Sequence, residues 1–225
     1  MPLNRRTLNR LVLSMGTAAA LGTALPAYAA DPRVKFVTSE GEFVVEVYPD
    51  KAPKTVENFL KYVKDKHYDG TVFHRVIKDF MVQGGGYDKD YKEKATRPSV
   101  IHEGRLAASK GLKNGVGTIA MARTNDPDSA TSQFFINVVD NTRLDPVLLP
   151  AGDPVTFEYQ GQTYKDVPRS KVERHPALMG YTVFGKVVSG MDTVEKIRNT
   201  PTGPGGPFPT DVPKKTVVIE SARIM

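Results

Sequence analysis

The stretch from Phe73 to Gly86, FHRVIKDFMVQGGG, constrains the fold more than any other part of the chain. Apolar and polar residues alternate on both sides of Lys78-Asp79, and glycines close the stretch. Alternation with a period of two predicts two short β-strands joined by a turn. Arg75 and Gln83 fall among aromatic and methionine side chains, which places a cation and an amide beside an apolar surface. The alternative interpretation is an edge strand with a solvated arginine.

The rest of the chain continues the β pattern. Residues 34–39 and 42–48 alternate around Glu40-Gly41, which predicts a hairpin. Further β-prone runs occupy residues 117–123, 132–138, 182–188 and 215–224. Mainly β structure is therefore expected.

Two helices and two loops complete this prediction. Pro53 opens an amphipathic helix that reaches about Lys66, and a short helix follows Gly190. Residues 88–97 are charged and aperiodic, and residues 200–213 are rich in Pro and Gly, so both are expected to be loops. Closure removes exposed sheet edges, so the predicted architecture is a closed antiparallel barrel capped by the two helices.

The composition excludes several kinds of chemistry. The chain has 225 residues, of which 40% are hydrophobic and 25% charged, as is typical of globular proteins. Cysteine is absent, which excludes thiolate catalysis, thiolate metal sites and disulfides. The histidines are scattered along the sequence, so neither a metal site nor a cofactor is predicted.

The N-terminus has the form of a secretory signal peptide. Arg5, Arg6 and Arg10 form a basic head, an apolar run covers residues 11–25, and Ala27-Tyr28-Ala29 is a small-x-small cleavage site. The run is too short for a stable membrane span, so residues 1–29 are predicted to be a removable leader rather than a retained anchor. Arg5-Arg6 also resembles a twin-arginine export signal. The mature protein is expected to be periplasmic or secreted.

Removal of the leader lowers the net charge. The leader carries three of the 31 basic residues and no acidic one, so 28 basic residues remain against 25 acidic ones, a net charge of +3. A charge this small gives no reason to expect binding to nucleic acid or to an acidic membrane. No nucleic-acid partner and no stable membrane association are therefore predicted.

Four segments occur in one order along the chain. They are FHRVIKDFMVQGGG (73–86), GTIAMAR (117–123), SQFFINV (132–138) and YTVFGKVVSGMDTVEKI (181–197). Together they resemble the cyclophilin family of peptidyl-prolyl cis–trans isomerases, and specifically its exported bacterial branch. The resemblance implies an eight-stranded antiparallel barrel capped by two α-helices. We expect a domain over residues 30–225, with an insertion at about residues 146–180.

The resemblance also assigns a site. Arg75 occupies the family's catalytic arginine position, and Gln83 matches the amide that orients it. The wall of the proline pocket corresponds to Phe80, Met81, Phe135 and Leu144. The neighbouring peptide groove and its rim correspond to Ala122, Arg123, Gln133 and Tyr181.

Two residues depart from the family pattern. Arg143 stands where many eukaryotic members carry a Trp, and Arg123 replaces a small polar residue. Both changes fall on the rim of the groove and leave the residues that carry the chemistry in place.

The site residues suit isomerisation of an X-Pro bond. The barrier of about 18–20 kcal/mol arises from C–N double-bond character, and no bond is broken, so no nucleophile, metal or proton relay is required. In the twisted transition state the prolyl nitrogen regains a lone pair. A donor such as Arg75, aimed at that nitrogen, binds the twisted form better than either planar isomer. The expected partners are proline-containing polypeptides and unfolded exported proteins, and the expected state is a monomer.

The inserted segment beside Leu144 is open to two interpretations. Residues 155–159 and 162–165 flank Gln160-Gly161 and predict an added hairpin. It is either a surface decoration, since long insertions cost little loop entropy, or an extra wall that selects substrates. Two other functions are alternatives to isomerase activity. A proline-peptide binding module or holdase with little catalysis would require a lost Arg75 or a blocked pocket, and the sequence shows neither. The four motifs argue against an unrelated β-barrel ligand binder.

Overall fold

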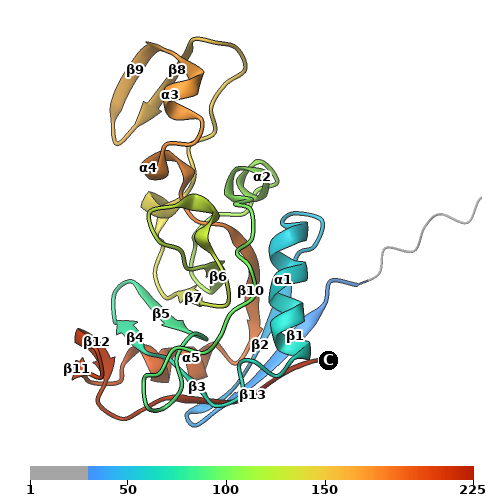
Figure 1. Ribbon diagram of the computed structural model, residues 1–225, viewed down its shortest axis with the longest axis vertical. Helices are drawn as coiled ribbons and strands as arrows, with labels where there is room; N and C mark the ends of the chain where they lie inside the picture. The colour runs from blue at the N-terminus through green and yellow to red at the C-terminus, as the bar shows by residue number, and fades with distance from the viewer. Residues whose placement is uncertain (1–29) are drawn as a thin grey trace, which may run out of the picture. The chain divides into compact units, whose positions relative to one another are not determined.

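The structure is a computed structural model that describes residues 30–225 (Figure 1). The predicted leader, residues 1–29, lies outside the described residues. Among the described helices, none combines the length and the apolar character needed to cross a membrane.

A single antiparallel sheet forms the body of the protein. Its strand order is β3-β13-β1-β2-β10-β6-β7-β5-β4. The strands are β1 (Arg33–Thr38), β2 (Gly41–Val47), β3 (Thr71–Val72), β4 (Arg75–Ile77), β5 (Met81–Gly84), β6 (Thr118–Met121), β7 (Phe134–Asn137), β10 (Val183–Ser189) and β13 (Val218–Ile224). The sheet curls strongly on itself (Figure 1).

The two ends of this sheet are joined by the chain itself. Only Phe73 and His74 separate β3 from β4, although β3 pairs with β13 and β4 pairs with β5. When β3 and β4 are counted as one interrupted strand, the nine strands form a ring of eight. The expected mainly β, antiparallel fold is thus confirmed, and the turn at Lys78-Asp79 lies where the alternation predicts it.

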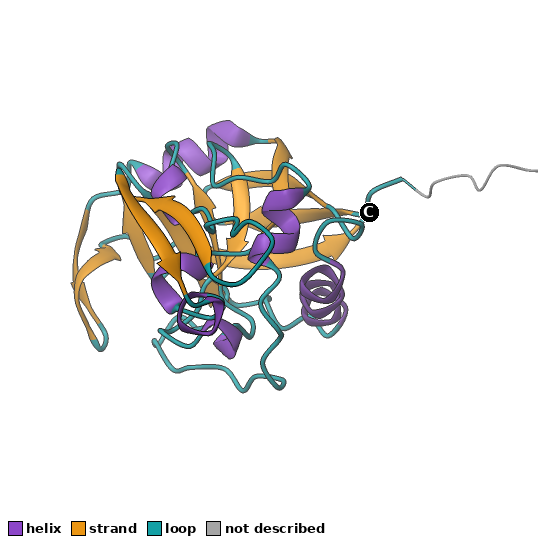
Figure 2. Cartoon of the chain, turned by 90° about the horizontal axis from the view of Figure 1, so that it is seen from above, coloured by secondary structure: helices purple, strands orange, loops and turns teal. Residues whose placement is uncertain are grey.

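Aromatic side chains fill the inside of the curled sheet. Phe36 and Phe43 stack with ring centroids 4.9 Å apart. Phe59, on helix α1 (Pro53–Lys64), lies 5.0 Å from Phe184. Such pairs contribute about 0.5–1.5 kcal/mol each beyond their burial, so the apolar face of α1 is fixed against the sheet. Both views show α1 beside the strands, and in Figure 2 it is seen end-on.

The N-terminus of α1 is capped by a residue far away in the sequence. Ala52, at the N-cap position, offers no side-chain acceptor. Instead the buried carboxylate of Glu103 accepts hydrogen bonds from the backbone N–H groups of Lys54 (3.1 Å) and Thr55 (2.8 Å) and from the Thr55 hydroxyl (2.8 Å). A carboxylate is well placed there, because the first-turn N–H groups have no helical partners and the helix dipole favours negative charge.

The remaining helices are short. Helix α5 (Met191–Arg198) begins directly after Gly190, as expected, and buries Val194 and Ile197 completely. Helix α2 (Gly104–Ser109) follows Glu103 and was not predicted from the sequence pattern.

The expectation of a loop at residues 200–213 is wrong. These residues form a two-stranded ribbon of β11 (Thr202–Gly205) and β12 (Phe208–Pro213). Phe208 packs on His74 at 5.5 Å and edge-on against Tyr87 at 5.2 Å, and Val212 is 2% exposed. Proline is tolerated because the ribbon pairs with no further strand. Contacts with residues distant in the sequence therefore hold the ribbon, and local propensity does not reveal them.

The segment from 146 to 180 has its own small core. It contains β8 (Val155–Tyr159), β9 (Gln162–Val167), α3 (Arg169–Val172) and α4 (Pro176–Met179), so the expected hairpin is present. The buried side chains of this core are Val155, Phe157, Val172 and Leu178. The two strands pair only with each other, and most of β9 is exposed.

Candidate active site

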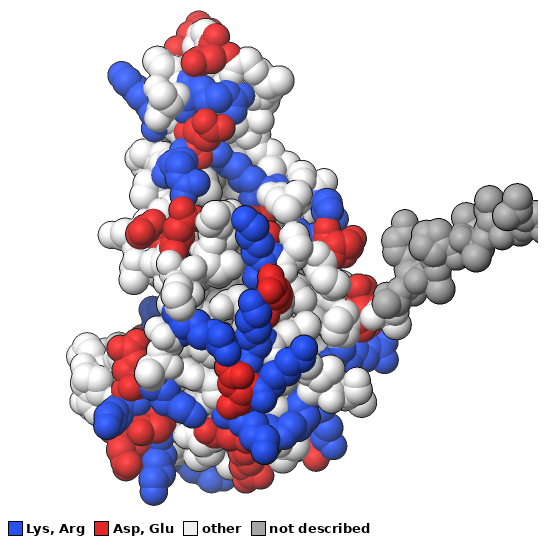
Figure 3. Space-filling view, turned by 45° about the vertical axis from the view of Figure 1, so that its right-hand side comes forward, with Lys and Arg blue, Asp and Glu red and all other residues white. Residues whose placement is uncertain are grey.

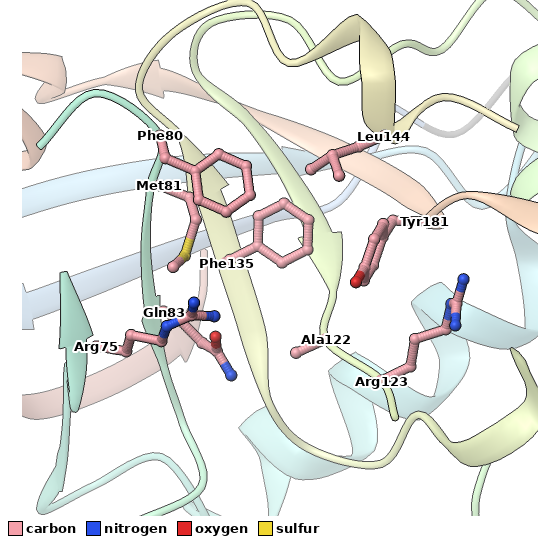
Figure 4. Close-up of a pocket in the computed structure, with 9 residues that line it drawn as sticks. All are labelled: Arg75, Phe80, Met81, Gln83, Ala122, Arg123, Phe135, Leu144 and Tyr181. Carbon is pink, nitrogen blue, oxygen red and sulfur yellow. The ribbon is translucent and has the colours of Figure 1, made fainter. Parts of the chain in front are cut away.

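One pocket on the outside of the sheet gathers nearly all the predicted site residues. Its volume is about 140 Å³, far more than one water molecule needs. The residues that line it are Arg75, Phe80, Met81, Gln83, Ala122, Arg123, Phe135, Leu144 and Tyr181 (Figure 4). Gln133, the remaining predicted residue, lines a neighbouring hollow together with Gln83, Ala122 and Arg123. The structure places these residues together, and their individual roles stay predictions.

Strand register explains why these side chains share one face. Arg75 on β4 lies opposite Gln83 on β5, which lies opposite Phe135 on β7. Successive side chains of a strand point to opposite faces, so the flanking Val76 and Val82 point into the core, where they are 1% and 0% exposed. The alternation within residues 73–86 therefore sends polar groups outward to the pocket and valines inward.

The floor and walls of the pocket are apolar. Met81 and Phe135 are 2% and 4% exposed. Tyr181 meets Phe135 edge to face, with ring centroids 5.4 Å apart. Partly buried Phe80 and Leu144 pack against the same cluster. A floor of aromatic and methionine side chains accommodates a small apolar ring without demanding hydrogen bonds from it.

Arg75 and Gln83 lie side by side at the edge of this apolar surface (Figure 4). Nearly half of the Arg75 side chain is exposed (46%), and its Nε lies 3.9 Å from Oδ2 of Asp211 on β12. Gln83 was expected to orient Arg75, but its Nε2 donates to Oε1 of Gln133 at 3.0 Å. The contact with Asp211 was not foreseen, since the two residues are far apart in the sequence and the ribbon that carries Asp211 was expected to be a loop.

A network of buried amides supports the wall of the pocket from behind. Nδ2 of Asn141 donates to the Phe80 carbonyl and to Oδ1 of Asn137, both at 2.8 Å. Asn137 in turn donates to Asn114, whose own N–H and amide bind the Asp145 carboxylate. The backbone segments that carry Phe80 and Leu144 are thereby tied together. No local pattern in the sequence points to these asparagines, because their partners are non-local.

Arg123 holds the segment after α4 against the pocket. Its Nε donates to the Gly180 carbonyl (3.0 Å) and one terminal nitrogen donates to the Pro176 carbonyl (3.0 Å). Its guanidinium also lies 4.8 Å from the centre of the Tyr181 ring. Arg123 was predicted as a groove residue, and the structure shows in addition that it anchors residues 176–180.

The histidines take no part in the pocket. His74 adjoins Arg75 but is buried on the opposite side, and burial lowers its pKa to about 4. Burial likewise lowers the pKa of His102 to about 4. Across residues 30–225, no three His, Cys, Asp or Glu side chains come together in a metal-binding arrangement.

Fold and pocket together define a class of protein: a curled antiparallel β-barrel with an apolar pocket on its outer face, edged by an arginine. Comparison with known families gives the same result. The family described as cyclophilin type peptidyl-prolyl cis-trans isomerase/CLD matches residues 33–224. The chain belongs to this family.

Individual relatives agree with this assignment. Peptidyl-prolyl cis-trans isomerase cyp18 of Streptomyces antibioticus is 45% identical over 85% of this chain and 98% of its own length. Peptidyl-prolyl cis-trans isomerase B of Escherichia coli is 44% identical with the same coverage. Peptidyl-prolyl cis-trans isomerase A of Dickeya dadantii is 43% identical over 96% of this chain and 97% of its own length.

Solved structures share the fold. A cyclophilin-type isomerase of Cryptosporidium parvum, crystallised in the presence of the dipeptide Ala-Pro, superposes with a TM-score of 0.59. It is 22% identical in sequence, and the match covers 86% of this chain and 98% of that one.

Proposed function

We propose that this protein accelerates cis–trans isomerisation of X-Pro bonds in exported polypeptides, and that Arg75 supplies the catalytic interaction. Peptidyl-prolyl isomerase activity follows from family membership and from relatives 43–45% identical over most of the chain. The exported substrates and the roles of individual residues are the proposed part. The observation that carries the proposal is the placement of Arg75 at the edge of a small apolar pocket.

The pocket separates two tasks. Met81, Phe135 and the residues around them hold the proline ring, which fixes the X-Pro bond beside Arg75. The guanidinium is permanently charged and carries a rigid fork of N–H donors. As the bond twists, the prolyl nitrogen becomes pyramidal and accepts a hydrogen bond that neither planar isomer can accept. Arg75 therefore binds the transition state in preference to both ground states, which is the requirement for catalysis.

The apolar surroundings strengthen this interaction. A proline seated on Phe135 and Met81 displaces water from the side of the guanidinium that faces the pocket, and electrostatic interactions gain strength when water is excluded. The Asp211 carboxylate, 3.9 Å from Nε, lies close enough to bias the orientation of the guanidinium.

The test compares wild type with Arg75→Ala and Arg75→Lys in a protease-coupled assay on X-Pro peptides. Arg75→Ala should lower kcat/KM by about 10²–10³, the scale of losing one transition-state donor. Arg75→Lys should also be poor, since a point charge on a flexible stem does not reproduce the fork. Circular dichroism and urea unfolding check that both variants fold normally. Undiminished turnover in Arg75→Ala would remove Arg75 from its proposed role.

The proposal of export rests on the sequence of residues 1–29, with its arginine head, apolar run and Ala27-Tyr28-Ala29. Mass spectrometry of the mature protein should find an N-terminus at about Ala30, in the periplasmic or secreted fraction. A mature chain that begins at Met1 in the cytoplasmic fraction would contradict export and leave the isomerase assignment untouched.

A further inference from the structure

A second, larger hollow adjoins the pocket. Its volume is about 610 Å³, and Arg123, Leu144 and Tyr181 line both spaces, so the two lie next to each other. Its remaining lining includes Arg143 and, from the 146–180 segment, His175 and Pro176. A polypeptide whose proline occupies the pocket would thus extend into this hollow on one side.

The hollow is positively charged. Arg123 and Arg143 line it, and none of its lining residues is Asp or Glu. Elsewhere basic and acidic side chains are interspersed over the surface shown in Figure 3, and several exposed arginines, such as Arg97 and Arg223, pair with carboxylates. Two acidic residues directly follow lining residues in the sequence. The Asp145 carboxylate accepts hydrogen bonds from the backbone and side chain of Asn114, and the Asp126 carboxylate accepts one from the backbone N–H of Asp128. No carboxylate among the residues that line the hollow therefore neutralises the charge of its two arginines.

Arg143 is presented for binding. It is exposed, and its guanidinium lies 4.8 Å from the centre of the Phe80 ring. Within residues 30–225 its side chain makes no ion pair and no hydrogen bond under ordinary distance limits. The aromatic face positions the guanidinium plane without using its N–H donors. Arg123 is held in a similar way over Tyr181, although carbonyl groups occupy its donors. Arg143 thus supplies free N–H donors, and Arg123 supplies a positive charge that is held in place.

We propose that this hollow is a specificity subsite for an acidic side chain, Asp or Glu, located one or two residues from the proline of the substrate. A guanidinium fork binds a carboxylate with two parallel hydrogen bonds, and the second arginine adds attraction without a competing acid. The inference rests on the proposed isomerase function, because it takes the pocket as the proline site. It also gives the 146–180 segment a role as one wall of the subsite.

The test uses matched X-Pro peptides that carry Glu or Gln at each of the two positions on either side of the proline. Glu and Gln have nearly the same shape, so the ratio of their kcat/KM values isolates the charge. At one position the Glu peptide should be favoured by about two- to fivefold at low ionic strength, as expected for an exposed ion pair. The preference should shrink in 0.5 M salt, where charges are screened over about 4 Å.

Two variants locate the effect. Arg143→Gln should reduce the Glu/Gln ratio toward one, leaving only the contribution of the Arg123 charge. Lys64→Gln, which removes the same charge from an exposed position at the end of α1, should leave the ratio unchanged. Dissociation constants of the same labelled peptides, measured by fluorescence anisotropy, should show the same preference without reference to turnover.

The outcomes separate the two claims. A Glu/Gln ratio near one at all four positions would overturn the subsite, as would a preference that is undiminished in Arg143→Gln. Failure of wild type to turn over the Gln peptides would contradict the proposed function instead, and the binding ratio would still decide the subsite.

Discussion

Asn141, in the amide network behind the pocket, is the residue whose replacement should affect both the stability of the protein and its activity. This residue is 3% exposed, and its Nδ2 group donates to both the Phe80 carbonyl and Oδ1 of Asn137. In Asn141→Ala the Phe80 carbonyl keeps a second donor, the backbone N–H of Val138 at 3.2 Å. Oδ1 of Asn137, which is fully buried, keeps no donor within residues 30–225.

The expected cost follows from this difference. An unsatisfied buried acceptor costs about 1–3 kcal/mol, and the lost bond to Phe80 adds about 1 kcal/mol. Asn141→Ala should therefore lower the free energy of unfolding by about 2–4 kcal/mol. Because Phe80 would be held less firmly, kcat/KM on X-Pro peptides should fall by about tenfold. The free energy of unfolding is measured by urea titration monitored by circular dichroism, because the chain contains no tryptophan to report unfolding by fluorescence.

Two comparisons make this prediction specific. Asn141→Asp keeps the shape but replaces the Nδ2 donor with a carboxylate oxygen, an acceptor that faces two other acceptors, so it should be at least as destabilised as Asn141→Ala. Asn199→Ala removes an exposed asparagine whose Nδ2 donates to the Glu195 carbonyl, and it should change stability by less than about 0.5–1 kcal/mol. If Asn141→Ala and Asn199→Ala were equally stable and active, the network would not support the pocket.

Two further perturbations test other parts of the structure. Glu103→Ala removes the acceptor for the first turn of α1 and should lower the free energy of unfolding by about 2–4 kcal/mol. Glu103→Gln keeps one acceptor oxygen, so it should lower the free energy of unfolding by only about 1–2 kcal/mol. Urea titration of both variants measures the difference. Burial lowers the pKa of His74 and His102 to about 4 from the ordinary 6.5, so the folded state favours neutral rings. Their contribution to stability is present above pH 6.5 and is lost as the pH falls toward 4. Urea midpoints measured between pH 6.5 and pH 4 should fall accordingly, and His74→Gln should make stability depend less on pH over this range.

Much of the sheet could be predicted from the sequence because its signal is local. Residues 73–86 alternate with the period of a strand, and the structure turns their valines inward and Arg75 outward. The helix from Pro53 and the hairpin at residues 155–165 were likewise visible in short patterns. These elements depend on side-chain periodicity, which one stretch of sequence carries in full.

The features that were missed depend on partners far away in the chain. The β11–β12 ribbon is held by Phe208 against His74 and Tyr87, and without those rings its Pro and Gly residues suggest a loop. The approach of Asp211 to Arg75 requires that ribbon. Arg123 was placed at the groove correctly, but its carbonyl partners in residues 176–180 could not be foreseen, because the path of the inserted segment is set by tertiary packing.

The central claim is that Arg75 binds the twisted X-Pro bond better than either planar isomer. NMR exchange spectroscopy at equilibrium measures it most directly, because the cis–trans exchange rate of an X-Pro peptide and its dissociation constant come from the same sample. In Arg75→Ala the enzyme-bound exchange rate should fall by about 10²–10³ while the dissociation constant changes by less than about threefold. A weaker dissociation constant with an unchanged enzyme-bound exchange rate would mean that Arg75 holds the ground state as firmly as the transition state, and would contradict this account.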